Sequence, residues 1–275
     1  MTAQAFAETG ARDMAPQDMA PQDMAPQDMA PGEWEVRVDL AAAFRLVAHY
    51  GWSDFLATHL SARVPGPQDH FLINPFGLLF EEITASCLVK VDLDGTLIGN
   101  RDRGINPAGF TIHSAVHAGR PEMTCVMHSH TPAGVGVATQ EDGLLPLTQH
   151  ALAVLAHTGY HDYEGLAMDL DERARIVRDL GDNNVLILRN HGLLTVGRSV
   201  GEAFMWMARV ERACRMQLAA QQSGARLRPI PAEIQAQTIA QNRHNNSAQG
   251  YRPIGRKEWP ALRRQLDRRD PSYKT

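Results

Sequence analysis

The chain has 275 residues and a formal net charge of −4, with 44% hydrophobic and 21% charged residues. This composition is typical of a globular protein with a substantial core, and the slightly acidic balance argues against nucleic acid as the main partner. No apolar run reaches the roughly 20 residues of a membrane helix, no signal-peptide pattern begins the chain, and the three scattered cysteines predict no disulfide framework, so we expect a cytoplasmic protein without a membrane partner.

The N-terminal segment repeats the five-residue unit DMAPQ. Proline at every fifth residue prevents a continuous helix, and the unit carries too little apolar surface to fold. We therefore expect residues 1–32 to form a disordered tail. The tail either recruits a partner or is a repeat expansion without a function of its own.

Four patterns predict the elements that follow the tail. Apolar residues recur at helical spacing from Trp34 onward, which predicts a helix. The segments 58–66 and 70–77 are short and separated by Pro, Gly and Asp, which predicts a hairpin. A second strand pair is predicted in 87–98, where an Asp-Gly turn divides alternating residues. The segment 106–121 opens with Asn-Pro and closes with Gly and Pro, as helices do.

The second half of the chain predicts a buried strand at 123–130 and a long amphipathic helix at 199–221. Between them, 184–197 is an apolar strand, a glycine turn and a second strand. After this helix the chain becomes polar and Pro-rich, and one more helix is predicted at 256–270. The mixture predicts an α/β fold with a central, mostly antiparallel sheet and helices packed around it.

The segment 121–134, PEMTCVMHSHTPAG, places His128 and His130 one residue apart at the end of a predicted strand. Residues two apart on a strand project from the same face, whereas Ser129 faces away, and imidazole is a common ligand of zinc, iron and copper. Taken alone, the pair fits either a metal site or two polar residues at a strand end. His191 favours the metal site, because it too closes an apolar strand directly before a glycine turn.

Other histidines are weaker candidates. His113 and His117 share one face of a predicted helix at a spacing that ligand pairs use. No acidic residue lies between them and the face is apolar, so packing, or support of a metal ligand, is the favoured interpretation. His150, His157 and His161 lie in loop or helix segments without fixed spacing and are pocket or surface candidates.

The motifs HSHTPAGVGVA and RNHGLLTVG, about sixty residues apart, resemble the class II aldolase/adducin family. INPFGLLFEEIT, VDLDG and NPAGFTIHSA are further similarities, and together the motifs cover roughly residues 35–225. The resemblance implies an α/β/α sandwich over residues 33–225, a C-terminal extension over 226–275, and often a homotetramer with each metal near a subunit boundary. The metal ligands that it implies are His128, His130 and His191.

The resemblance also shows what this chain lacks. In the sugar-phosphate aldolases of the family, a glutamate near the start of the helix before the HxH strand is the catalytic acid/base, and Gly109 occupies that place here. Glycine cannot transfer a proton, and general acid–base catalysis is typically worth about 10²–10⁴-fold. The candidates to replace the glutamate lie in the segment GYHDYEG and are Tyr160, His161 and Tyr163.

A second difference concerns the phosphate site. Aldolases of the family hold a substrate phosphate with small hydroxylated residues at two turns, where this chain has Phe76 and Gly77, and Pro107 and Ala108 before Gly109. A phosphate dianion needs N–H, O–H or positively charged groups, which these side chains do not supply. We expect the five residues to line a pocket for a larger, uncharged or aromatic substrate.

Within the family, the chain is similar to the oxygenases of aminocoumarin antibiotic pathways. These remove the side chain of 3-prenyl-4-hydroxyphenylpyruvate, through the mandelate, to give 3-prenyl-4-hydroxybenzoate. The resemblance favours a non-haem Fe²⁺ dioxygenase that acts on an aromatic 2-oxo acid with O₂, because a 2-oxo acid can chelate an ion held by three neutral histidines.

Two alternatives stay open. The first is a Zn²⁺-dependent aldolase, epimerase or decarboxylase that acts on an unphosphorylated hydroxy-carbonyl compound. The second is a non-catalytic, adducin-like binding module, which the complete set of three histidines disfavours.

Overall fold

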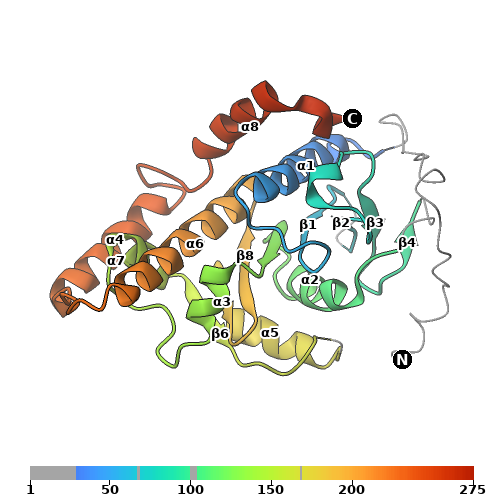
Figure 1. Cartoon of the computed structure of the whole chain (residues 1–275). Coiled ribbons are helices and arrows are strands. Elements are labelled where there is room, and N and C mark those ends of the chain that lie inside the picture. The colour runs from blue at the N-terminus through green and yellow to red at the C-terminus, as the bar shows by residue number, and fades with distance from the viewer. Residues whose placement is uncertain (1–28, 67–68, 100–103, 168) are drawn as a thin grey trace.

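The computed structural model describes residues 29–66, 69–99, 104–167 and 169–275 (Figure 1). The predicted tail, residues 1–32, lies outside the described residues except for 29–32. The first helix begins at Glu33, one residue before the predicted start. In the described part of the chain, no helix is both long and apolar enough to cross a membrane.

An eight-stranded sheet forms the centre of the molecule, with the strand order β4-β3-β2-β1-β5-β8-β7-β6. Neighbouring strands are antiparallel except for β6 and β7, which are parallel. The prediction of a mostly antiparallel sheet is therefore confirmed. The strands are β1 His59–Arg63, β2 Phe71–Ile73, β3 Val89–Val91, β4 Leu97–Ile98, β5 Cys125–Ser129, β6 Thr158–His161, β7 Val185–Leu188 and β8 Gly192–Gly197.

Helices cover both faces of the sheet, which gives the predicted α/β/α layers (Figure 1). The helices are α1 Glu33–His49, α2 Pro107–Gly119, α3 Pro132–Ala138, α4 Gln149–Leu155, α5 Glu172–Leu180, α6 Val200–Gln222, α7 Ala232–Asn246 and α8 Glu258–Arg269, with short 3₁₀ turns at Phe80–Glu82 and Pro271–Lys274. α1 and α6 pack on one face, whereas α2 and α5 pack together on the other.

The core is divided by the sheet because successive strand residues point to opposite faces. On β5, Met127 joins the cluster beneath α1 and α6, while Val126 joins the cluster beneath α2 and α5. The predicted C-terminal extension contributes to the first cluster through Trp259 and Tyr273, which are 8% and 0% exposed. The extension is therefore packed into the same core as the rest of the fold.

All three cysteines are free and buried. Cys125 lies on β5 and Cys214 lies in α6. Burial raises the pKa of both thiols, that of Cys214 to about 12.

The predicted elements from the first helix to the β7–β8 pair, α6 and α8 are all present. Apart from the short 3₁₀ turns, five elements were not predicted: helices α3, α4, α5 and α7, and strand β6. Helix α7 has no buried residue, so its sequence carries no apolar stripe that could mark a helix. Strand β6 has four residues, and only His161 among them is buried. The placement of His161 in a loop or helix was therefore wrong, since it ends a strand.

Candidate metal centre

Three strand ends bring the predicted ligands together. His128 lies on β5, His130 directly follows that strand, and His191 lies in the turn between β7 and β8. In this turn Asn190 adopts a φ of 56°, and a Cβ on Gly192 would lie 2.4 Å from the carbonyl oxygen of Ser129. Glycine therefore allows β8 to start tight against the end of β5. As a result, the His191 ring centroid lies 4.8 Å from that of His128 and 4.9 Å from that of His130.

The geometry of the three rings fits a metal ion. One ligand nitrogen from each of His128, His130 and His191 lies within 4.8 Å of the others. Nδ1 of His128 lies 3.0 Å from the Leu193 carbonyl oxygen, and Nδ1 of His130 lies 3.1 Å from Oδ2 of Asp54. Both oxygens accept, so each Nδ1 carries the hydrogen and donates it.

The Nε2 atoms of His128 and His130 therefore each keep a lone pair. These two atoms lie only 2.8 Å apart. Two such lone pairs repel one another unless a cation lies between them. This donor set, with its outer hydrogen bonds to a carbonyl and a carboxylate, is the arrangement in which proteins hold divalent metals.

Electrostatics favour the same conclusion. Burial lowers the pKa of His128 well below its usual value, and burial with the nearby His130 lowers the pKa of His191 to about 4. Both rings are therefore neutral at neutral pH, which is the protonation state that a metal ligand requires.

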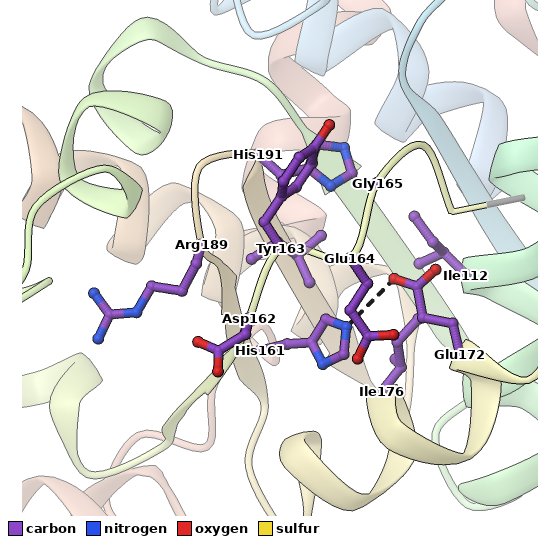
Figure 2. A pocket seen from close by; sticks show the side chains of 11 residues that line it. Ile112, His161, Asp162, Tyr163, Glu164, Gly165, Glu172, Ile176, Arg189 and His191 are labelled. Atoms are coloured by element: carbon purple, nitrogen blue, oxygen red, sulfur yellow. Dashed lines mark hydrogen bonds and ion pairs between the residues drawn. The ribbon is translucent and has the colours of Figure 1, made fainter. Parts of the chain in front are cut away.

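The three predicted acid/base candidates have different surroundings. Tyr163 is 53% exposed, and its ring centroid lies 6.4 Å from that of His191; Figure 2 shows the two rings close together. Both ring nitrogens of His161 are occupied, Nδ1 by Asp179 at 2.7 Å and Nε2 by Glu172 at 3.3 Å.

Tyr160 has a structural environment. Its hydroxyl accepts a hydrogen bond from the Leu144 backbone N–H at 3.1 Å, and the guanidinium of Arg189 lies 4.4 Å from the ring centroid. Among the three candidates, only Tyr163 therefore presents an uncommitted polar group beside the histidines.

The predicted pocket wall begins at the N-terminus of α2. The side chain of Asn106 accepts hydrogen bonds from the backbone N–H groups of Ala108 and Gly109, at 3.0 and 3.4 Å, and Pro107 has no N–H. These first-turn donors are therefore not available to a phosphate.

The other two wall residues lie in a separate loop. Phe76 is 55% exposed, and its backbone N–H donates to the Gly104 carbonyl oxygen at 2.9 Å. Gly77 adopts a φ of 103°, a conformation that glycine tolerates. This hydrogen bond joins the loop to the segment before α2.

A fourth histidine at the centre was not predicted from the sequence. His59 on β1 pairs in register with His128, and their ring centroids lie 5.1 Å apart. A Cβ on Gly109 would lie 2.4 Å from Cδ2 of His59, so this ring fills the space beside the glycine. Its Nδ1 is 2.8 Å from Nε2 of His113 on α2. The signal that could have identified it is the alternation of His59, Ser61 and Arg63 along one strand face.

His113 and His117 do not join the metal group. Both are buried in α2, at 0% and 1% exposure, and both contact the hydroxyl of Ser61. The predicted packing role agrees with these positions.

Comparison with known proteins identifies relatives over nearly the whole described chain. Residues 38–218 match the class II aldolase and adducin N-terminal domain. A crystal structure of an aldolase II superfamily protein from Pseudomonas syringae is 50% identical, covers 90% of this chain and 98% of its own, and has a TM-score of 0.84. An L-fuculose 1-phosphate aldolase from Glaciozyma antarctica is 30% identical, covers 93% of this chain and 97% of its own, and has a TM-score of 0.76.

Alpha-adducin of Rattus norvegicus is a relative of another kind. It is 42% identical over 246 residues, which make up 86% of this chain and 33% of the adducin. The chain therefore matches about a third of that longer protein. Since the family model covers well over half of the sequence, this chain belongs to the class II aldolase and adducin family.

Proposed function

We propose that the chain is a metal-dependent lyase that cleaves a carbon–carbon bond in a small, unphosphorylated hydroxy-carbonyl compound. The observation that carries the proposal is the convergence of His128, His130 and His191, in which the Nε2 atoms of His128 and His130 lie 2.8 Å apart. A divalent ion held there would polarise a substrate carbonyl and stabilise the negative charge that develops as the bond breaks.

The chain's own groups then have defined tasks. His128, His130 and His191 hold the ion, while the Leu193 carbonyl and Asp54 fix the orientation of two of these rings. Tyr163 is half-exposed and its ring centroid lies 6.4 Å from that of His191, and its hydroxyl carries the proton to or from the substrate.

The surroundings of Gly109 favour a substrate without a phosphate. The backbone N–H groups of Ala108 and Gly109 are capped by Asn106, and Phe76 and Pro107 add no donor. A phosphate dianion at this turn would lack the donors that it needs. The similarity to an L-fuculose 1-phosphate aldolase supports the reaction type, and this turn argues for a different substrate.

We propose Zn²⁺ in place of the Fe²⁺ that the resemblance to oxygenases favoured. Three neutral imidazoles with an open position form the donor set of catalytic zinc sites, whereas non-haem iron oxygenases use two histidines and one carboxylate. Among the described residues no carboxylate belongs to the three-histidine group. The similarity to a protein named an L-fuculose 1-phosphate aldolase supports a lyase. The homotetramer expected from the family stays part of the proposal.

The test begins with metal analysis of the purified protein and of its His191→Ala variant. Both are then loaded with Zn²⁺ or, without oxygen, with Fe²⁺. They are assayed for cleavage of unphosphorylated 4-hydroxy-2-oxo acids and ketoses, for cleavage of ketose 1-phosphates, and for O₂ uptake with aromatic 2-oxo acids. His150→Ala is the matched control, because His150 is exposed and lies in α4, outside the metal group.

We expect cleavage of an unphosphorylated substrate by the zinc form, no cleavage by His191→Ala, and normal activity in His150→Ala. Oxygen uptake by the iron form without cleavage by the zinc form would refute the lyase and support the oxygenase. A wild-type protein that folds without binding metal would instead support the adducin-like binding module.

A further inference from the structure

A row of four buried polar side chains leads from the metal centre into the packing between β1 and α2. Nδ1 of His59 lies 2.8 Å from Nε2 of His113, whose Nδ1 lies 2.5 Å from Oγ of Ser61. The same Oγ lies 2.8 Å from Nε2 of His117. None of the four residues is more than 2% exposed. Each contact must therefore be a hydrogen bond with a definite donor, because water cannot replace it.

The three rings of this row are neutral. Burial lowers the pKa of His59 and of His113 well below the usual value. Burial, together with the nearby guanidinium of Arg63, lowers the pKa of His117 to about 3. A neutral imidazole carries one N–H and one lone pair, so each ring has only two possible tautomers.

The far end of the row decides between these tautomers. Nδ1 of His117 is fully buried and has no hydrogen-bond partner in the described structure. Buried N–H groups without an acceptor are rarer than buried acceptors without a donor. The lone pair of His117 therefore belongs on Nδ1, and its hydrogen belongs on Nε2, where it is donated to Ser61.

The remaining hydrogens follow in order. The Ser61 hydroxyl accepts from His117, so it donates its own hydrogen to Nδ1 of His113. The hydrogen of His113 is then on Nε2 and is donated to Nδ1 of His59. His59 is left with its hydrogen on Nε2. With neutral rings and these contacts, no other arrangement leaves every enclosed N–H and O–H of the row with an acceptor.

We propose that His59 presents its Nε2–H to the metal centre as a fixed hydrogen-bond donor to the substrate, in the space that the absent side chain of Gly109 leaves free. The Cδ2–Nε2 edge of the ring lies against Gly109, and the ring centroid is 5.1 Å from that of His128. Nε2 of His59 has no hydrogen-bond partner among the described residues. Unlike Nδ1 of His117, this atom is not fully buried.

The role of this donor rests on the proposed lyase function. A preorganised N–H beside the metal stabilises negative charge that develops on a substrate oxygen, without itself gaining or losing a proton. His113, Ser61 and His117 are positioning residues, because they act only through the tautomer of His59. A single neutral donor suits a carboxylate or enolate oxygen, and it is far less than a phosphate dianion requires.

The direct test is the ¹⁵N NMR spectrum of the full-length, zinc-loaded protein labelled in its histidines and recorded without substrate. The His59 signals are assigned by their loss in His59→Gln. An N–H nitrogen at Nε2 and a lone-pair nitrogen at Nδ1 support the proposal, whereas the opposite assignment overturns it. Because the spectrum needs no turnover, it decides the tautomer whether or not the lyase reaction is found.

Two pairs of variants test the consequences. His59→Ala should lower kcat by about 10²–10³-fold with a smaller change in KM, since one transition-state donor is lost. His59→Gln keeps an N–H donor of similar reach and should recover at least about tenfold. An unchanged kcat in His59→Ala, in a protein that cleaves substrate, would overturn the catalytic role.

Ser61→Ala interrupts the row, so the Nε2 signal of His59 should shift towards that of a lone-pair nitrogen, while Ser61→Thr keeps the hydroxyl and the wild-type signal. If Ser61→Ala leaves the signal unchanged, the row does not set the tautomer. If neither Ser61 variant folds, the wild-type spectrum still decides the assignment of His59.

Discussion

The tight contact between Gly109 and His59 makes Gly109→Ala the sharpest test of the site. The added Cβ would lie 2.4 Å from Cδ2 of His59 and 2.8 Å from its Nε2, whereas ordinary contact begins at 3.4 Å. The ring or the first turn of α2 must therefore move by about 1 Å. His59 is buried between α2 and β5, so the ring has little room to move without breaking its hydrogen bond to His113.

Two costs follow from this displacement. Overpacking of a well-packed site costs about 1–3 kcal/mol, and leaving buried hydrogen-bonding groups unpaired costs about 1–3 kcal/mol more. For a chain of this size about 1 kcal/mol corresponds to roughly 2–4 °C in Tm. We therefore expect Gly109→Ala to lower Tm by roughly 4–24 °C.

The assay is thermal unfolding of the zinc-loaded protein, with Gly104→Ala as the matched control. Gly104 precedes the same helix, and a Cβ there would meet nothing within 4 Å. This control should stay within about 0.5 kcal/mol of the wild type, as surface substitutions usually do.

A double variant separates the steric cause from a general weakening of α2. In His59→Ala the ring is gone, so a further Gly109→Ala should cost at least about 1 kcal/mol less than it does alone. The reasoning is refuted if the two substitutions simply add, or if Gly109→Ala unfolds at the same temperature as Gly104→Ala.

Three further predictions concern the metal and the buried histidines. His191→Ala should lose stoichiometric zinc in elemental analysis while the assembly survives size-exclusion chromatography, and retained zinc would contradict the ligand assignment. Asp54→Asn should weaken zinc affinity about 10–100-fold in a competitive chelator titration, because Asp54 orients His130, and an unchanged affinity would show that it does not. Burial and nearby arginines lower the pKa of His157 to about 4, so the unfolded state binds the proton more readily and stability should fall as the pH drops from about 6.5 to 4. His157→Phe, which keeps a ring against Trp206, should flatten this loss in unfolding scans, and an equal slope would contradict the assignment.

The convergence of His128, His130 and His191 could be predicted from the sequence. His128 and His130 have fixed spacing on one strand, and His191 precedes a glycine turn, so short-range patterns place all three at strand ends. The sheet then brings these ends together through the pairing of β5 with β8. The empty side-chain position at Gly109 could also be read directly from the sequence.

What fills that position could not be predicted. His59 lies on β1, fifty residues before Gly109, and nothing local relates the two. Their contact depends on the register of β1 with β5 and on the packing of α2 across β1. The same holds for His161, whose two carboxylate partners come from α5. Such contacts are set by tertiary packing, which residue periodicity does not encode.

The buried thiols offer a way to observe how the fold opens. A thiol reacts as its thiolate, so Cys125 and Cys214, which are enclosed and have raised pKa values, should be inert to an alkylating reagent until they become exposed. Their modification rates therefore measure the free energies of opening at two places. Because Cys125 shares β5 with His128 and Cys214 lies in α6, zinc that slows only the first rate would hold the strand closed, whereas zinc that slows both would hold the sheet and α6 together as one cooperative unit.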